Sequence, residues 1–119
     1  MVYLASSPAS ALLEVLVHFE SDLGLLPMTY QLLEVQLPAS VKILSLDEAQ
    51  LPEKWAKDLA QTKALGDAWV VSASSAAIWV PSAVAPRTNN LLFNPKHPDA
   101  LKATIKSHGQ YPFDVRLLR

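Results

Sequence analysis

Short apolar runs separated by prolines, serines and asparagines dominate the pattern of this chain. The run at residues 76–80 is bounded by serines and by Pro81, which is typical of a strand buried on both faces. Because Pro81 has no amide proton, pairing must fail there or the strand must lie at a sheet edge. A second run at 91–93 follows a polar loop and ends at an Asn-Pro turn signal. These runs predict a central sheet with Ser82 just past a strand end, where loops on a rigid scaffold often bear functional groups.

The first twenty residues predict a strand followed by an apolar helix. Residues 2–5 favour a strand that begins with almost no lead-in. The following Ser-Ser-Pro, at 6–8, supplies an N-cap and a proline at the first helical position. The helix is expected to run from Pro8 to about Glu20. It is apolar nearly all round, so we expect it to be buried on most sides.

Three polar residues interrupt this helix, namely Ser10, Glu14 and His18, and their spacing puts them on one narrow stripe. The spacing alone favours an ordinary exposed face. The alternative is that Glu14 lines a cleft, because a carboxylate on an otherwise buried helix tends to be paired or functional. A metal shared by Glu14 and His18 would need a third ligand at a suitable spacing, and the sequence offers none, so we expect no metal site.

The remaining pattern predicts further strands and helices in alternation. We expect a loop at 21–28, strands at 29–37 and 41–46, and a short helix after the segment 51–55. A helix is expected at 62–72, with its inward face formed by Leu65, Ala68 and Trp69. A short helix at 99–104 and a last, irregular strand at 111–117 complete the prediction. Interspersed strands and helices indicate a mixed α/β fold.

Composition limits the class of protein. A chain of 119 residues, half of them hydrophobic, fits a single domain over residues 1–119 with a substantial core. The net charge of −1 argues against direct nucleic-acid binding, which calls for a basic balance. The absence of cysteine fits a reducing cytoplasm, and the sequence shows no signal peptide. No apolar run approaches the roughly 20 residues that would span a bilayer.

Six segments of the chain, taken together and in order, are informative: Tyr3 to Ser7, Ala11 to His18, Leu65 to Trp69, Val80 to Val84, Leu91 to Pro98 and Phe113 to Leu117. In this order they resemble the RES-domain family of bacterial toxins. No single segment is very specific, whereas six in order are. The resemblance implies a small sheet-centred domain similar to the ADP-ribosyltransferase fold and an activity that degrades NAD as a substrate, with no cofactor. It also implies pairing with an antitoxin that has a helix-turn-helix domain; a homodimer stays open.

The resemblance also assigns roles to residues. Tyr3, Glu14 and Ser82 occupy the positions of the family's active-site tyrosine, glutamate and serine. The family's arginine lies upstream of the tyrosine, beside a Gly-Gly-Arg-Trp-Asn-like stretch, whereas here the chain begins two residues before Tyr3. We therefore expect a domain that is truncated at its N-terminus, by a misassigned start or a true deletion.

The chemistry expected of these residues follows from cleavage of the bond between nicotinamide and ribose. Glu14 would stabilise the oxocarbenium-like centre or orient the attacking acceptor. Ser82 would hydrogen-bond the ribose or Glu14 and is not expected to be a nucleophile, because no histidine-based activating pair is apparent. Tyr3 would stack on or hydrogen-bond the nicotinamide end. With water as acceptor the enzyme is a glycohydrolase and with phosphate a phosphorylase. The alternative is an inactive remnant that only binds the antitoxin.

Overall fold

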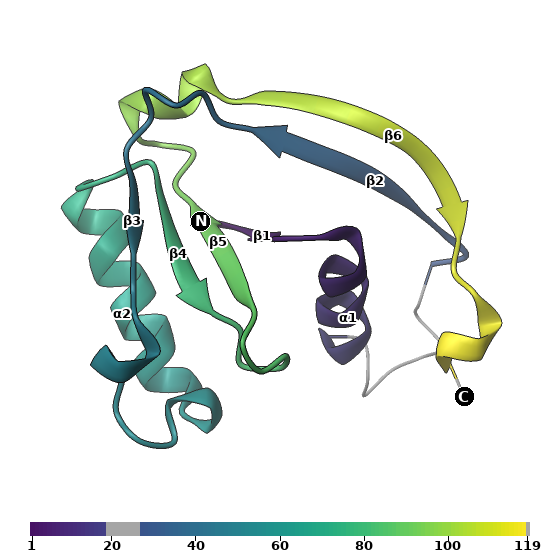
Figure 1. Ribbon diagram of the computed structural model, residues 1–119, viewed down its shortest axis with the longest axis horizontal. Coiled ribbons are helices and arrows are strands. Elements are labelled where there is room, and N and C mark those ends of the chain that lie inside the picture. The colour runs from purple at the N-terminus through teal and green to yellow at the C-terminus, as the bar shows by residue number, and fades with distance from the viewer. Residues whose placement is uncertain (19–26, 119) are drawn as a thin grey trace.

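A four-stranded mixed sheet forms the centre of the computed structural model, which describes residues 1–18 and 27–118 (Figure 1). The strands lie in the order β1 (Val2–Ala5), β5 (Asn89–Phe93), β4 (Ala77–Pro81) and β3 (Ile43–Ser45). β5 pairs antiparallel with both β1 and β4, whereas β3 pairs parallel with β4. The predicted mixed α/β fold and its central sheet are confirmed, although β3 is shorter than the predicted strand at 41–46.

The end of β4 is set by Pro81, as the sequence predicts. Pro81 is the last residue of β4 to pair with β5, opposite Asn89. The next amide, that of Ser82, donates to the carbonyl of Thr88 at 2.8 Å as the chain turns toward β5. β3 pairs with β4 only at residues 77–79, so Pro81 has a neighbouring strand on one side only, and of the two options that a proline allows, the structure shows the edge position. Ser82 therefore lies where the chain leaves the sheet.

Helix α2 (Leu59–Ser72) lies along this sheet beside β3 and β4 (Figure 1). It begins three residues earlier than predicted, because Asp58 accepts a hydrogen bond from the Gln61 amide at 3.0 Å and caps the helix. Trp69 is buried, as expected. The inward placement of Ala68 is wrong: it is exposed, because one residue turns the side chain by about 100° away from Trp69.

Helix α1 (Pro8–His18) begins at the predicted cap. The Ser7 hydroxyl accepts from the Ser10 amide at 3.1 Å, and the Ser10 hydroxyl accepts from the Ser7 amide at 3.2 Å. The expected burial on most sides is wrong, since none of its residues is fully buried and Val17 is 42% exposed. The helix stands between the central sheet and a curved hairpin, so that only part of its surface is covered (Figure 1). Its predicted last residues, 19–20, and most of the predicted loop at 21–28 lie outside the described residues.

The curved hairpin is a separate antiparallel pair, formed by β2 (Thr29–Gln36) and β6 (Thr104–Pro112). The predicted strand at 111–117 is wrong, because the strand ends at Pro112 and a 3₁₀ turn, η5 (Val115–Leu118), follows. All nine residues of β6 are exposed. Pairing along β2 therefore holds this strand in place, and its sequence shows little of the apolar alternation that marks a half-buried strand.

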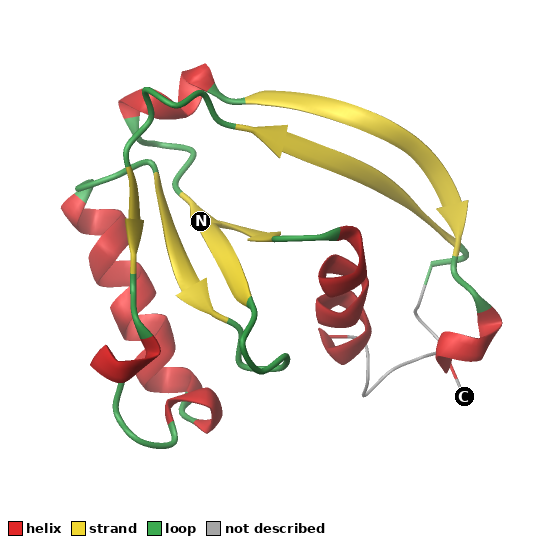
Figure 2. Cartoon of the chain, in the orientation of Figure 1, coloured by secondary structure: helices red, strands yellow, loops and turns green. Residues whose placement is uncertain are grey.

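Short 3₁₀ helices connect the larger elements (Figure 2). They are η2 (Glu48–Gln50), η3 (Trp55–Lys57) and η4 (Pro98–Lys102). The short helix predicted after 51–55 corresponds to η3, and the one predicted at 99–104 corresponds to η4, which ends two residues earlier. η2 was not predicted. No helix in the described part of the chain has the length and apolar character to cross a membrane.

Candidate active site

Glu14 and Ser82 lie in direct contact although they are 68 residues apart in the chain. The Ser82 hydroxyl donates a hydrogen bond to Glu14 Oε1 at 2.8 Å. Glu14 projects from the middle of α1, and Ser82 follows the last residue of β4. The polar stripe of α1 is therefore not one plain exposed face: Ser10 belongs to the helix cap, and Glu14 is half-buried against the end of the sheet.

Ser82 is almost fully buried, with 7% of its surface exposed, and its hydroxyl is saturated with hydrogen bonds. In addition to donating to Glu14, Oγ accepts from the amides of Val84 at 3.2 Å and Ala85 at 3.0 Å. A hydroxyl has one donor and two acceptor sites, so all three are in use. Of the two partners expected for Ser82, the structure shows Glu14. The occupied lone pairs disfavour a role as nucleophile.

Asn90 is a further residue of this site, which the sequence analysis missed. Its Nδ2 donates to the same oxygen, Glu14 Oε1, at 3.0 Å, and its side chain is 7% exposed. The register of the sheet pairs Asn90 with Val80, two residues before Ser82, which brings both donors to one corner. Asparagine is rare inside strands, so the predicted strand began at residue 91 and left Asn90 in a loop. What identifies Asn90 is its burial on the strand that faces Ser82, which the sequence alone does not show.

The Glu14 carboxylate has neutral donors and no cationic partner among the described residues. Its two hydrogen-bond donors are a hydroxyl and an amide, and none of the ion pairs in the described chain includes Glu14. Both contacts go to Oε1, so Oε2 has no hydrogen bond from the described protein. A half-buried carboxylate of this kind is suited to a positive charge that a ligand brings or develops.

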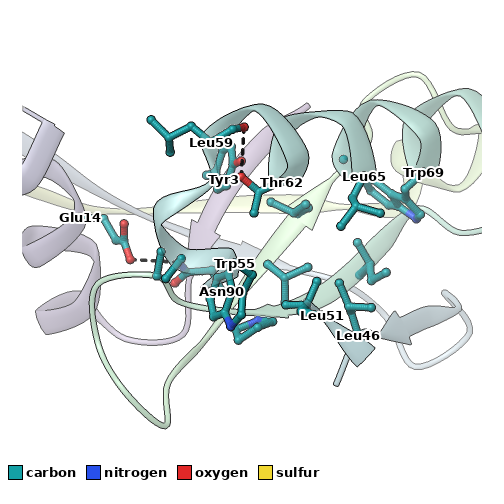
Figure 3. Close-up of a pocket in the computed structure, with 17 residues that line it drawn as sticks. Tyr3, Glu14, Leu46, Leu51, Trp55, Leu59, Thr62, Leu65, Trp69 and Asn90 are labelled. Carbon is teal, nitrogen blue, oxygen red and sulfur yellow. Dashed lines mark hydrogen bonds between the residues drawn. The ribbon is translucent and has the colours of Figure 1, made fainter. Parts of the chain in front are cut away.

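A pocket of about 210 Å³ opens beside Glu14, between the sheet and α2 (Figure 3). Its polar side chains, those of Tyr3, Glu14, Thr62 and Asn90, come from β1, α1, α2 and β5. Its remaining walls are mainly apolar and aromatic: Leu46, Leu51, Trp55, Leu59, Leu65, Trp69, Ile78, Val80 and Leu92 are among them. A cavity with an apolar body and a few convergent polar groups is the usual form of a small-molecule site.

Tyr3, the third predicted site residue, lines this pocket from the edge strand β1. It pairs across the sheet with Leu92, which also lines the pocket, and 69% of its surface is exposed. The structure thus brings all three predicted residues to one region, with Ser82 behind Glu14 and Tyr3 at the pocket wall. Stacking of Tyr3 on a ligand stays a prediction.

Two tryptophans contribute to the pocket and were not assigned to it from the sequence. The Trp55 indole donates to Glu48 Oε1 at 3.3 Å, and the Trp69 indole donates to Ser75 Oγ at 3.1 Å. Because both N–H groups are engaged elsewhere, the two residues add apolar ring surface and no further donor. The described residues include no group of three histidines or carboxylates that could hold a metal ion.

Comparisons with known proteins find sequences similar to nearly the whole chain. The sequence model of the RES domain matches residues 1–114. The chain is 42% identical to the protein named "Toxin Res" of Pseudomonas putida, over 98% of this chain and 79% of that protein. It is 36% identical to the "Prs ADP-ribosylating toxin" of a Sphingobium species, over 100% of this chain and 75% of that protein. A second "Toxin Res", from Yersinia enterocolitica, is 38% identical over 81% of this chain and 62% of that protein.

Proposed function

This chain belongs to the RES domain family, and we propose that it acts as a toxin enzyme that degrades NAD by cleaving the bond between nicotinamide and ribose. The relatives named as toxins support the first part of the proposal. The name of the Sphingobium relative supports the second, because ADP-ribosylation with NAD breaks this same bond.

The observation on which the proposal rests is the Glu14 carboxylate, held by two neutral donors beside an apolar pocket. When the bond between nicotinamide and ribose breaks, its electron pair leaves with nicotinamide, which becomes neutral. Positive charge then develops on the anomeric carbon and ring oxygen of the ribose, as in glycoside cleavage generally. A fixed carboxylate lowers the energy of that state more than it lowers the energy of bound NAD.

The second half of the reaction needs an acceptor. Water or inorganic phosphate attacks the anomeric carbon, which forms the new carbon–oxygen bond; attacking water then loses a proton. In this scheme Glu14 stabilises the centre under attack, and Ser82 holds Glu14. Tyr3 and the apolar wall contact the nicotinamide end, where a flat ring gains from stacking and from exclusion of water. NAD is the substrate, and the scheme assigns no cofactor and no metal.

The partners follow from the proposed toxin role. We propose an antitoxin with a helix-turn-helix domain as the binding partner, with the enzyme acting in the cytoplasm, where NAD is consumed. A homodimer is compatible with this scheme.

The proposal is tested by incubating the purified chain with NAD, with and without phosphate, and following nicotinamide release by chromatography. We expect nicotinamide in at least one condition, accompanied by ADP-ribose if water is the acceptor and by its 1-phosphate if phosphate is. A folded protein that releases no nicotinamide in either condition would contradict the proposed reaction. That result would favour the alternative, an inactive chain that only binds the antitoxin.

A further inference from the structure

We infer that Asn90 is a positioning residue for Glu14: together with Ser82 it fixes Oε1 and thereby leaves Oε2 as the oxygen that faces the reacting ribose. This inference rests on the proposed function and assigns a role within the same site. The two donors come from different elements, the loop after β4 and the strand β5. Their convergence on one oxygen, at 2.8 and 3.0 Å, restricts rotation of the carboxylate about its last bond.

The orientation of the Asn90 amide follows from its neighbour. If the amide were turned, Oδ1 would face the carboxylate oxygen, and two acceptors would meet with no proton between them. Nδ2 must therefore face an ionised Glu14. This orientation leaves Oδ1 buried without a hydrogen-bond partner, the one such side-chain atom in the described part of the chain. A buried acceptor without a partner lowers stability, so the geometry has a cost for the fold.

A second buried asparagine, Asn94, lies just past the other end of β5 and provides the comparison. Asn94 is 2% exposed, and both ends of its amide are used. Its Oδ1 accepts from the Lys96 amide at 3.1 Å, and its Nδ2 donates to the Val70 carbonyl at 3.5 Å. Asn94 thus joins β5 to its following turn and to α2. These contacts are the ones expected of an asparagine whose role is to stabilise the fold. Asn90 has one satisfied end, and that end contacts the proposed catalytic carboxylate.

The two asparagines therefore respond differently to the same substitution. Leucine has the same branching at Cγ as asparagine and no polar atoms. Asn94→Leu removes two bonds that stabilise the fold, and we expect it to lower the unfolding temperature by ~5 °C or more. Asn90→Leu removes the unpartnered Oδ1 together with the bond to half-buried Glu14, so we expect an unchanged or higher unfolding temperature. A loss as large as that for Asn94→Leu, found for Asn90→Leu and for the smaller Asn90→Ala alike, would overturn the inference, whatever the activity.

Kinetics provide the second readout. Since Asn90 acts through Glu14, Asn90→Leu should lower kcat for nicotinamide release by roughly ten- to a hundredfold, with little change in KM. The same substitution in a Glu14→Gln background should have little further effect, because the carboxylate it positions is already gone. An additional loss of the same size in that background would overturn the inference.

A substitution by a smaller residue serves as a second test, for the event that leucine is too bulky at position 90. Asn90→Ala removes both amide atoms without adding volume, and we expect the same fall in kcat as for leucine. Normal kcat in folded Asn90→Ala would overturn the positioning role. If the parent chain itself releases no nicotinamide, the proposed reaction fails, and the contrast in unfolding temperature between Asn90→Leu and Asn94→Leu still tests whether Asn90 is kept for the fold.

Discussion

Glu14 has an arrangement of hydrogen bonds that makes one substitution unusually informative. Both of its donors bind Oε1, so the carbonyl oxygen of a glutamine at this position can accept the same two bonds. The glutamine Nε2 then takes the place of Oε2. Glu14→Gln therefore keeps the size and the contacts and removes the negative charge. The charge is the property that the proposed mechanism requires.

Ser82→Ala separates two roles for this serine. If Ser82 only holds Glu14, its loss should reduce nicotinamide release by roughly ten- to a hundredfold and leave clear residual activity. We expect that result, because Oγ already donates to Glu14 and accepts from two amides. Complete loss of activity in a folded Ser82→Ala protein, together with a covalent adduct on the parent serine, would contradict the positioning role.

The sequence identified some of these residues and not others for physical reasons. Local pattern made Glu14 and Ser82 only candidates, as a carboxylate on an apolar helix and a serine just past a strand end, and the family resemblance assigned them to the site. The contact between them depends on how α1 lies against the sheet, which no local pattern specifies. Asn90 was missed because its polarity predicted a loop, whereas pairing with β4 keeps it in a strand.

At the scale of elements, the hairpin of β2 and β6 depends on side chains that the sequence pattern did not mark. Tyr30 stacks on Tyr111 with ring centroids 5.8 Å apart and contacts Phe113 at 4.9 Å. On the same hairpin, His108 lies 2.8 Å from Glu34 Oε1. The hydrogen bond from His108, with a second from Gln36, holds the pKa of the Glu34 carboxyl below its ordinary value. These cross-strand contacts support a strand pair whose residues are mostly exposed.

The Glu34 contact predicts a pH-dependent contribution to stability. Because the pKa is lowered on folding, the contribution is present above the ordinary carboxyl pKa and is lost as the pH falls through the lowered value. Glu34→Gln should therefore reduce the free energy of unfolding slightly near pH 6.5, and the difference from the parent should disappear near pH 3. Urea unfolding at both pH values measures this. The control is Glu53→Gln, for which the structure shows no hydrogen bond or ion pair. A deficit that persists unchanged near pH 3 would contradict the assignment.

Some helices and strands could be predicted from the sequence, and others could not. The apolar runs predict α2, β4 and β5, although α2 begins three residues and β5 two residues before the predicted start. The cap at Ser7 marks the start of α1. β6 has few apolar residues and is held by pairing with a strand about seventy residues earlier in the chain. The burial of α1 was overestimated. An apolar sequence predicts that a helix is buried, but it does not specify which elements pack against the helix or how much of its surface they cover.

The whole molecule exposes more surface than a compact monomeric protein of the same mass. Its accessible surface is 8489 Å², whereas a compact monomer of 13.0 kDa has about 6,300 Å². The radius of gyration is 15.4 Å, against about 13.5 Å expected for this length. The hairpin arching away from the sheet accounts for the open shape (Figure 1). Exposed apolar residues lie on it, including Leu33 at 50% and Ile105 at 69%.

This surface predicts association of the isolated chain. Val35 and Ile105 pair across the hairpin and share one face, whereas Lys106 lies on the other. We expect sedimentation velocity to show oligomers that grow with concentration, and we expect Ile105→Lys to weaken them. Lys106→Ala is the control and should have little effect. A parent chain that stays monomeric at all concentrations would contradict the prediction.

The central claim is that the charge of Glu14 drives cleavage of NAD, and the rate of nicotinamide release by the parent and Glu14→Gln tests it most directly. We predict a rate lower by on the order of a hundredfold or more for Glu14→Gln, at an unchanged unfolding temperature. Glu53→Gln should match the parent. A folded Glu14→Gln protein that releases nicotinamide at the parental rate would contradict the account.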